Sequence, residues 1–568
     1  AERAKGGVGL IILEGTAVHP TSTAFGSKLI WTFDERSIPG LSLIADGVHQ
    51  YGAKIFSEIF HVGISNTGMD SRLPVWGPSD IPDPAYREIP HQMEIEEIKE
   101  NIEGYGKAAE NIKKAGFDGV EVHAAHSYQL HQFLSPLFNK RTDEYGGSLE
   151  NRMRFLLEVI DRVREKIGYG LALGVRMTGD DLTTGGLTLD DTKTVAKGLE
   201  ATGKVNYLSV SVGNPFTKVL QIAPMYVPPG HIVYMAAAIK EVVNIPVFTV
   251  GRITDPVLAE SILAEGKADM VAMTRALIAD PELPNKALEG RLDDIRACIG
   301  CMQACAARFS ALRGIGCVQN PAVGREREWG AGTLKSAEKR KRVLVVGGGP
   351  AGMEAARVAA LRGHDVILYE REKELGGQVN LAAKLPGREE VGSVARWLEI
   401  QIKKLGVKVV IEKEVTPEVV EELKPDAVVV ATGAKYVKMG FTGFLPGLPF
   451  IPGSEQENVV TPEQILRREV KAGRKVVILD EDGLIEPLGL AELLASEGSE
   501  VEILTFLTHV GGSLDFINRG MVYRRVFDKG VKLTPLSYIK EISGNTVIAY
   551  NIYSREERII EDVDTVVL

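Results

Sequence analysis

The chain has 568 residues, and a soft prior of about 150 residues per domain predicts three or four domains. Its 44% hydrophobic and 25% charged residues are ordinary globular values, which exclude a disordered, fibrous or disulfide-framework protein. The net charge of −10 argues against a nucleic-acid partner, and no run of about 18 apolar residues predicts a membrane span.

Up to about residue 275, short apolar strands alternate with amphipathic helices. The expected strands are Val8–Leu13, Lys54–Phe60, Gly119–His123, Leu171–Met177, Tyr207–Val212, Val247–Val250 and Met270–Thr274. The expected helices are Ile95–Ile112, Leu149–Ile167, Thr188–Thr202, Val233–Val243 and Pro256–Glu265. Alternation of this kind predicts an α/β fold, either a doubly wound sheet or a (β/α)8 TIM barrel. Loss of a first strand would leave a barrel with the seven strands found.

Both ends of the chain read as parts of larger elements. The first residues, AERAKGGVGLIILEG, predict the tail of a helix, a glycine turn and a strand, and the last residues, DTVVL, predict a strand. We therefore expect a chain incomplete at both ends. No targeting segment is visible, which favours a cytoplasmic protein.

Four domains follow from these patterns. Residues 1–290 form the expected barrel, and residues 291–330 contain every cysteine of the chain. A polar, basic linker covers 331–342, and βαβ patterning then restarts twice, over 341–470 and over 471–568. The two later domains are expected to be Rossmann-like, with the second incomplete at its C-terminus.

The cysteines have the spacing C-x2-C-x3-C-x11-C, at Cys298, Cys301, Cys305 and Cys317. Four thiolates that converge on one point can hold zinc or an iron–sulfur cluster. Structural zinc sites usually show two CxxC pairs, so a tight triplet followed by one distant cysteine favours a [4Fe–4S] cluster over zinc. Four unrelated buried thiols are the remaining alternative.

A dinucleotide fingerprint lies in RVLVVGGGPAG (342–352), where Gly347, Gly349 and Gly352 follow a strand and open a helix. Glu370 ends the next strand and would bind ribose hydroxyls, with Arg371 beside it. ELGGQ, which ends at Gln378, and the ATG at 431–433 fit a flavin-type domain with two dinucleotide folds. The alternative is a tight turn in an unrelated α/β protein.

The second βαβ unit, KVVILDEDGLIEPLGL (475–490), lacks such a loop. Asp480, Glu481 and Asp482 replace the glycine run, and Gly483 and Gly489 are out of step. Acids beside a pyrophosphate would repel it, so the fold is expected to remain while nicotinamide binding is doubtful.

Polar residues follow the strands of the barrel, at the end where barrel enzymes bind and react. Gly251–Arg252 and Thr274–Arg275 follow the last two strands and predict a phosphate site. Arg176 could place a positive charge beside a flavin ring. Surface or buried ion pairs are the alternatives for these arginines.

His123, His126 and Tyr128 follow the strand 119–123. Two imidazoles can bind one carbonyl oxygen, and a tyrosine hydroxyl can deliver a proton to the polarised double bond. A metal pair or satisfied core histidines are the alternatives.

With these motifs in place, the chain resembles the old yellow enzyme family in its long multi-cofactor branch, which includes 2,4-dienoyl-CoA reductases and trimethylamine dehydrogenases. The matching segments are GFDGVEVHAAHSYQLHQFLSPLFNKRTDEYGGSLENR (116–152), VGRITDP (250–256), ADMVAMTRALIADP (268–281), RLDDIRACIGCMQAC (291–305) and RVLVVGGGPAG (342–352). The resemblance implies FMN in the barrel, a [4Fe–4S] cluster at the cysteines and FAD or ADP on the GGGPAG domain. It also implies FMN contacts from Glu58, Arg176, Arg252 and Arg275, a carbonyl-binding pair at His123 and His126, and a proton donor at Tyr128.

Several positions depart from the family pattern. Glu58 stands where ene-reductases usually have Gln, and the HxGR motif reads HVGI, with Ile64 in place of its arginine. Amine dehydrogenases have Tyr where this chain has His123, and YLSVSVGNPF (207–216) offers neither the acid nor the tryptophan that they need. The x3 cysteine spacing matches the dienoyl-CoA reductase type.

These features predict an ene-reductase that passes electrons from NAD(P)H or another donor through FAD and the cluster to FMN, and then to an enone, enoate or enoyl thioester. The alternatives are an amine-type dehydrogenase that passes electrons to a carrier protein, and a degenerate electron-transfer scaffold. A small-molecule substrate is expected, with no membrane or nucleic-acid partner and with oligomerisation left open.

Overall fold

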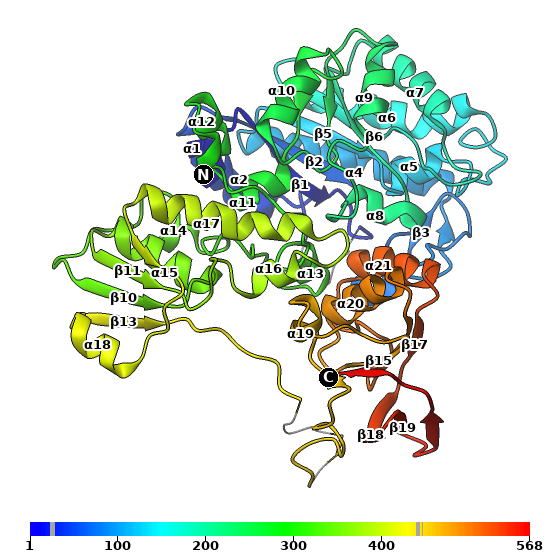
Figure 1. The fold of residues 1–568 in the computed structure, drawn as a ribbon. Coiled ribbons are helices and arrows are strands. Elements are labelled where there is room, and N and C mark those ends of the chain that lie inside the picture. The colour runs from blue at the N-terminus through cyan, green and yellow to red at the C-terminus, as the bar shows by residue number, and fades with distance from the viewer. Residues whose placement is uncertain (23–28, 439–443, 446) are drawn as a thin grey trace. The chain divides into compact units, whose positions relative to one another are not determined.

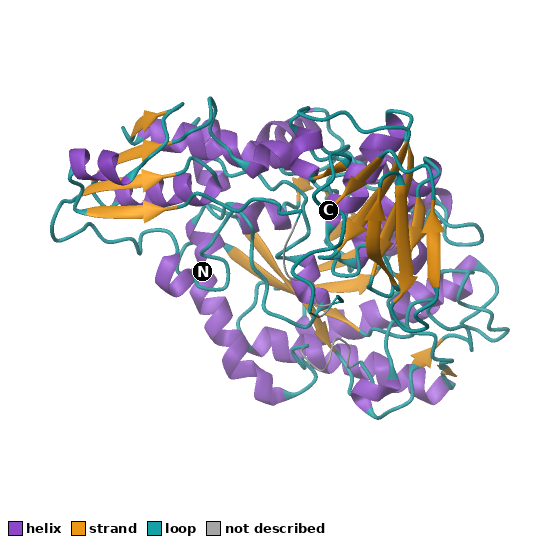
Figure 2. Ribbon diagram, turned by 60° about the horizontal axis from the view of Figure 1, so that its bottom comes forward, coloured by secondary structure: helices purple, strands orange, loops and turns teal. Residues whose placement is uncertain are grey.

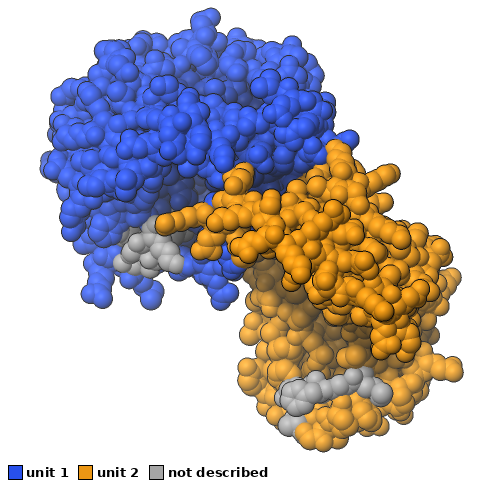
Figure 3. Space-filling view, turned by 90° about the vertical axis from the view of Figure 1, so that its left-hand side faces the viewer, with its two compact units in different colours: residues 1–298, 308–326 blue, residues 299–307, 327–568 orange. Residues whose placement is uncertain are grey.

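The computed structural model describes residues 1–22, 29–438, 444–445 and 447–568. The chain divides into two compact units (Figure 3). Unit 1 contains residues 1–298 and 308–326, and unit 2 contains residues 299–307 and 327–568. None of the helices in these described ranges is both long enough and apolar enough to cross a lipid bilayer.

Unit 1 is built on a parallel sheet of seven strands in which neighbours in sequence are neighbours in space (Figure 1). The strands are β1 (Leu10–Ala17), β2 (Lys54–Phe60), β5 (Gly119–Ala124), β6 (Ala172–Thr178), β7 (Tyr207–Ser211), β8 (Val247–Thr249) and β9 (Met270–Val271). This order is that of a (β/α)8 barrel, and it confirms the predicted fold class. A two-stranded sheet of β3 (Trp76–Gly77) and β4 (His91–Gln92) was not predicted.

The helices of unit 1 connect these strands. They are α1 (Glu2–Lys5), α2 (Ile38–His49), α3 (Gly68–Ser71), α4 (Ile95–Lys114), α5 (Gln129–Leu134), α6 (Leu149–Ile167), α7 (Leu189–Ala201), α8 (Lys218–Gln221), α9 (Val233–Lys240), α10 (Pro256–Ala264), α11 (Thr274–Ala279) and α12 (Leu283–Leu288). Helix α6 has the predicted limits because Ser148 caps its first turn and Gly168, at φ 71°, ends it. Its apolar face joins the main core with Phe155, Val159 and Ile160.

The last strand of the sheet is shorter than predicted. β9 ends at Val271, and Thr274, expected at the end of that strand, is the first residue of helix α11. Two short helices, α13 (Ala306–Ser310) and α14 (Glu326–Trp329), lie in the cysteine-rich stretch of the chain and after it.

Unit 2 contains two parallel sheets, visible among the strands of Figure 2. The first has the order β12 (Lys408–Val410), β11 (Asp365–Tyr369), β10 (Arg342–Val346) and β13 (Ala427–Val430). Its helices are α15 (Pro350–Leu361), α16 (Gln378–Ala382), α17 (Ser393–Lys404) and α18 (Pro417–Leu423). Helices α15 and α17 pack against this sheet through an apolar core that includes Met353 and Leu398.

The second parallel sheet has the order β14 (Val459–Val460), β21 (Thr565–Val567), β15 (Lys475–Asp480), β16 (Glu500–Thr505) and β17 (Lys532–Thr534). Its helices are α19 (Pro462–Leu466), α20 (Ile485–Ser496) and α21 (Phe516–Asp528). An antiparallel sheet of β18 (Ser537–Ser543), β19 (Thr546–Asn551) and β20 (Glu557–Ile560) was missed from the sequence.

Candidate functional site

The predicted histidine–tyrosine set lies where β5 ends and the chain turns into α5. His123 is the second-last residue of the strand, and residues 125–128 form the connection. His126 and Ser127 have φ angles of 60° and 59°, a left-handed conformation that non-glycine residues rarely adopt. The turn therefore places His126 and Tyr128 at a cost in backbone strain.

The structure brings the three predicted side chains together. The ring centroids of His123 and His126 are 5.0 Å apart, those of His123 and Tyr128 are 4.8 Å apart, and those of His126 and Tyr128 are 6.3 Å apart. Phe60, the last residue of β2, contacts Tyr128 edge to face at 4.8 Å. The three form one aromatic cluster at the carboxyl end of the sheet.

Both imidazoles in this cluster are neutral. Burial, followed by the charge of Arg176, lowers the pKa of His123 and of His126 well below the usual value. The Ala125 amide donates to Nδ1 of His123 at 3.2 Å, so the neutral ring carries its hydrogen on Nε2. Nε2 of His126 lies 2.6 Å from the Ser211 hydroxyl, and burial raises the pKa of Tyr128. At neutral pH these rings can donate hydrogen bonds, and Tyr128 keeps its proton.

A buried charge cluster lies on the neighbouring strands. The guanidinium of Arg176 donates to Glu58 at 2.9 Å, and Nε2 of His123 lies 3.8 Å from the other oxygen of that carboxylate. Glu121 pairs with Glu58 across the two strands and accepts a hydrogen bond from the Tyr207 hydroxyl at 2.9 Å. Burial and the adjacent Glu58 raise the pKa of Glu121 to about 8, so it is mostly protonated at neutral pH.

Glu121 and Tyr207 were not recognised as site residues from the sequence. The available signal was strand periodicity, because Glu121 is two residues before His123 and therefore faces the same side of the sheet. Gly174 on β6 makes the contact between them feasible. A Cβ there would lie 2.0 Å from the Tyr207 ring, so only glycine lets the phenol cross β6 to reach β5.

The two predicted phosphate arginines anchor the loop that follows β7. Arg275 donates to the Ala223 carbonyl at 2.6 Å, and Arg252 donates to the Val227 carbonyl. Gly251, at φ 127°, and Arg252, at φ 55°, shape the turn after β8. Both arginines thus bind carbonyl groups of the same loop, the one that follows β7. Their predicted contact with a phosphate stays a prediction.

The residues of unit 1 fit a bound flavin. Nε of Arg176 is buried and finds no hydrogen-bond partner within the described ranges, although its side chain is 29% exposed. A guanidinium donor that the protein leaves unsatisfied suits an anionic or carbonyl-rich ring system. Glu58, only 5% exposed, holds this guanidinium in place.

In unit 2 the glycine fingerprint has its predicted context. Strand β10 leads into Gly347, whose φ is 107°, and α15 begins one residue after Gly349. A Cβ on Gly352 would lie 1.9 Å from the Gly347 carbonyl oxygen, so the turn requires glycine at that position. The amide of Gly348 donates to Glu370 at 2.6 Å, which joins the loop to the end of β11.

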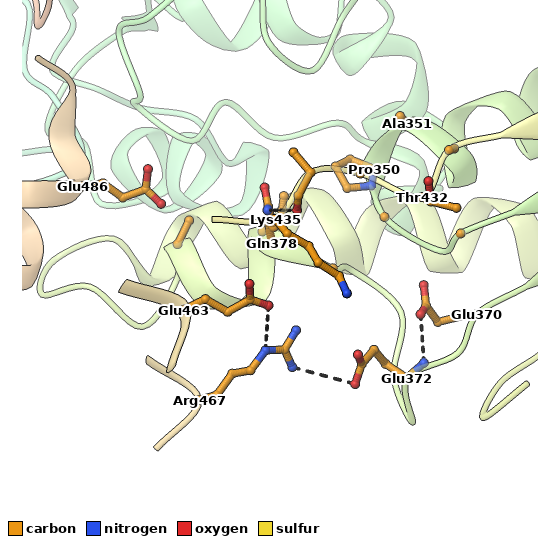
Figure 4. Close-up of a pocket in the computed structure, with 18 of the residues that line it drawn as sticks. Pro350, Ala351, Glu370, Glu372, Gln378, Thr432, Lys435, Glu463, Arg467 and Glu486 are labelled. Carbon is orange, nitrogen blue, oxygen red and sulfur yellow. Dashed lines mark hydrogen bonds and ion pairs between the residues drawn. The ribbon is translucent and has the colours of Figure 1, made fainter. Parts of the chain in front are cut away.

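This loop borders a cavity of about 690 Å³ within unit 2 (Figure 4). Glu370, Arg371 and Gln378 line the cavity, as do residues 431–435. Figure 4 shows Arg467 between two carboxylates, with Nε 2.9 Å from Glu463 and an Nη 3.8 Å from Glu372. The size of the cavity and its open glycine loop suit a nucleotide cofactor.

Arg388 was missed from the sequence and also lines this cavity. It is 7% exposed, and its buried Nε has no hydrogen-bond partner among the residues described. No motif surrounds Arg388 in the sequence, so only the fold could place it beside the glycine loop.

The second βαβ unit carries its own anion in place of a glycine loop. Asp480, at the end of β15, is fully buried and accepts hydrogen bonds from the amides of Gly483 at 2.8 Å and Gly511 at 2.9 Å. Glu481 accepts a hydrogen bond from Tyr538, and Asp482 accepts one from the Leu484 amide. The Asp480 carboxylate therefore already uses two backbone amides of this unit, in addition to the repulsion predicted from the sequence.

The four cysteines are partly exposed, with Cys298 and Cys317 in unit 1 and Cys301 and Cys305 in unit 2. No group of three or more His, Cys, Asp or Glu residues in the described part of the chain is arranged to hold a metal ion. The cluster predicted from the spacing therefore remains a prediction. Within unit 2, Asn518 of α21 donates to the Cys301 carbonyl at 3.0 Å, and Gln303 and Ala307 line the cavity.

Comparisons with known proteins agree with this description. Residues 1–294 match the NADH:flavin oxidoreductase / NADH oxidase family, and residues 341–568 match the pyridine nucleotide-disulphide oxidoreductase family. A NADH oxidase of Thermoanaerobacter brockii is 40% identical over 556 residues, covering 96% of this chain and 83% of the relative.

Solved structures that match the whole chain include two enzymes. One is 2-naphthoyl-CoA reductase in complex with 2-naphthoyl-CoA, with a TM-score of 0.90, 33% identity and 85% of its chain covered. The other is histamine dehydrogenase from Rhizobium sp. 4-9, with a TM-score of 0.93, 28% identity and 83% of its chain covered.

The fold and these matches define a flavin-dependent oxidoreductase. The chain belongs to the NADH:flavin oxidoreductase / NADH oxidase family, in the multi-domain branch related to old yellow enzyme. The family matches support FMN binding by the first domain and FAD or NAD(P)H binding by the second.

Proposed function

We propose that this oxidoreductase is an ene-reductase that acts on a C=C bond conjugated to a carbonyl group, in an enone, an enoate or an enoyl thioester. The observation that carries the proposal is the contact of His123 with both His126 and Tyr128, with ring centroids 5.0 and 4.8 Å apart. The similarity to 2-naphthoyl-CoA reductase supports a conjugated acyl substrate.

Each of the three side chains has a role in this reaction. His123 and His126 would donate hydrogen bonds to the substrate carbonyl oxygen, which draws electron density from the β-carbon. Because burial and Arg176 lower the pKa of both histidines, the two imidazoles would be neutral and would bind the oxygen without transferring a proton to it. Tyr128, whose pKa is raised by burial, would give its phenolic proton to the α-carbon and recover one from solvent.

The cofactors complete this proposal. FMN bound in unit 1 would supply the hydride for the β-carbon, and Glu58, Arg176, Gly251, Arg252, Thr274 and Arg275 are the residues proposed to hold it. FAD or ADP is proposed in the cavity of unit 2, beside Gly347, Gly349 and Glu370. The cysteine spacing supports a [4Fe–4S] cluster as a further redox group, which iron and acid-labile sulfide analysis would test.

A second candidate is dehydrogenation of an amine, with electrons passed to a carrier protein. Asp480 favours the dehydrogenase, because its carboxylate already accepts hydrogen bonds from backbone amides of the second βαβ unit. Those amides are then not available to bind a nicotinamide nucleotide as electron donor. The similarity to histamine dehydrogenase points the same way. His123 favours the reductase, since an imidazole donor suits a carbonyl oxygen better than an amine.

Anaerobic mixing of the oxidised protein with candidate electron donors separates these functions. Bleaching of the flavin absorbance by NADH or NADPH supports the reductase, and bleaching by amines alone supports the dehydrogenase. No response to either, in a protein that lacks flavin and iron, indicates a degenerate scaffold. His123→Ala should also weaken the binding of 4-chlorophenol, whose phenolate oxygen mimics the substrate carbonyl, and unchanged binding would remove His123 from the proposed site.

A further inference from the structure

Another histidine, in the helix that follows the His126–Tyr128 turn, forms a buried pair with an acid. His131 lies on α5 and Asp181 lies in the loop after β6, and neither side chain is exposed. Nε2 of His131 is 3.0 Å from Oδ1 of Asp181. The other carboxylate oxygen accepts from the Leu187 amide at 2.8 Å and from the Ser135 hydroxyl at 3.0 Å.

The other nitrogen of His131 contacts the strained turn. Nδ1 accepts a hydrogen bond from the Ser127 amide at 2.8 Å, and Ser127 is the second of the two residues with left-handed φ. Left-handed backbone is strained for non-glycine residues, so two such residues in succession persist only where their surroundings hold the turn in place. On the opposite side, the His126 amide donates to the Thr178 hydroxyl at 3.1 Å.

These contacts fix the tautomer of His131. Since Nδ1 accepts the Ser127 hydrogen, the neutral ring must carry its own hydrogen on Nε2, the nitrogen that lies 3.0 Å from Asp181. Burial alone would raise the pKa of Asp181, but His131, the Leu187 amide and Ser135 together hold that pKa below its usual range. A carboxylate behind an imidazole therefore presents a fixed acceptor to one backbone amide.

We propose that Asp181 and His131 are positioning residues for the ene-reduction. The pair holds the Ser127 amide, and through it sets the places of His126 and Tyr128 on either side. This role rests on the proposed function of the turn. The pair connects the loop after β6 to α5 and, through Nδ1 of His131, to the Ser127 amide in the loop after β5. Its test therefore needs a readout that a loss of general stability would not move.

Replacement of His131 by three side chains tests this role. His131→Gln can present an oxygen to Ser127 and an NH2 group to Asp181, His131→Asn is too short to reach both, and His131→Leu offers neither. We expect kcat for reduction of 2-cyclohexenone to fall on the order of tenfold to a hundredfold in the Leu variant, with KM for the electron donor unchanged. The Gln variant should recover most of this loss, and the Asn variant should lie between the two.

The chain provides a matched control in a second histidine–acid pair. His49 at the end of α2 lies 2.7 Å from Asp118, which directly precedes β5, at the end of the sheet opposite the turn. His49→Leu should leave kcat unchanged. Equal rates in the Gln and Leu variants of His131, or a wild-type rate in the Asn variant, would overturn the proposal, and the Asn variant keeps the test open if the Leu variant does not fold.

Hydrogen exchange separates this proposal from the proposed function. Amide protection in a peptide that covers residues 124–130 should fall in His131→Leu and return in His131→Gln, whatever substrate the enzyme uses. If exchange follows this pattern while cyclohexenone is not reduced by the wild type, the ene-reductase function fails and the positioning pair stands. Unchanged protection in the Leu variant would overturn the pair itself.

Discussion

The two βαβ units of unit 2 share the same arrangement of strands and helix, but the loops after their first strands differ in whether they can bind an anion. After β10, Gly347 and Gly352 give a glycine-lined turn beside a cavity of about 690 Å³. After β15, the side chain of Asp480 accepts hydrogen bonds from the backbone amides of Gly483 and Gly511. One loop is open to an anion from solution, and the other binds an anion that belongs to the chain.

This difference shows that a fold which can bind a dinucleotide does not have to do so. The strand and helix pattern determines the scaffold, whereas a few side chains in the loop determine whether a ligand can enter. An internal carboxylate keeps the second loop ordered without a cofactor, because it satisfies buried amides that would otherwise be unpaired. Variants at four positions test this contrast, in order of decreasing effect.

Gly352→Ala should have the largest effect. The added Cβ would lie 1.9 Å from the Gly347 carbonyl oxygen, so the open loop must change shape. We expect at least about a hundredfold weaker nucleotide retention in unit 2, measured as adenine nucleotide released by acid from the purified protein. Gly349→Ala is the control for folding, since its Cβ meets no atom within 4 Å, and its Tm should match the wild type. Full nucleotide content in Gly352→Ala would refute the open-loop assignment.

Asp480→Ala should destabilise the second unit without creating a nucleotide site. It leaves the amides of Gly483 and Gly511 without their acceptor, at a cost of about 1–3 kcal/mol each. Thermal unfolding should therefore begin at a lower temperature, while calorimetry should detect no NADH site that the wild type lacks, because Glu481 and Asp482 remain. An unchanged Tm would show that the carboxylate does not hold this loop.

Glu121 extends the comparison to a buried acid with no backbone amide to hold its charge. Its pKa of about 8 lies above the unfolded value near 4.5, so the folded state keeps a proton that the unfolded state releases. Its contribution to stability is therefore present below pH 4.5 and is lost as the pH rises through 8, by an amount on the order of a few kcal/mol. Tm measured against pH should decline less steeply in Glu121→Gln than in the wild type. Parallel curves would contradict the shifted pKa.

Arg388→Met should have the smallest effect. The buried guanidinium lines the cavity beside the open loop, and its loss should weaken nucleotide retention by about tenfold, roughly one charge-assisted hydrogen bond. Arg388→Lys should recover part of the binding because it keeps the charge. Binding equal to the wild type in the Met variant would exclude Arg388 from the nucleotide site.

The sequence predicted elements whose signals are local. Strand β2 has the predicted limits because it is a short apolar run, and helix α6 has them because Ser148 caps its first turn. Strand β9 was overextended, since Thr274 follows it closely and its apolar neighbours also suit a helix. The antiparallel strands β18–β20 were missed because their pairing depends on contacts with each other and not on βα alternation.

The same limit applies to the site. His123, His126 and Tyr128 are close in sequence, so their spacing was enough to predict that they gather. The contact of Glu121 with Tyr207 spans 86 residues and depends on the small size of Gly174, and the contact of Asp480 with Gly511 spans 31 residues. Such pairs become visible only when the fold brings distant strands into register.

Reduction of a conjugated C=C bond at the His123–Tyr128 cluster can be tested by single-turnover oxidation of the reduced protein. The fully reduced wild type, mixed anaerobically with 2-cyclohexenone, should regain its flavin absorbance and yield cyclohexanone. Tyr128→Phe should slow this step by about a hundredfold while leaving 4-chlorophenol binding intact. A reduced protein that cyclohexenone does not oxidise, but whose oxidised form is bleached by a secondary amine, would contradict the claim.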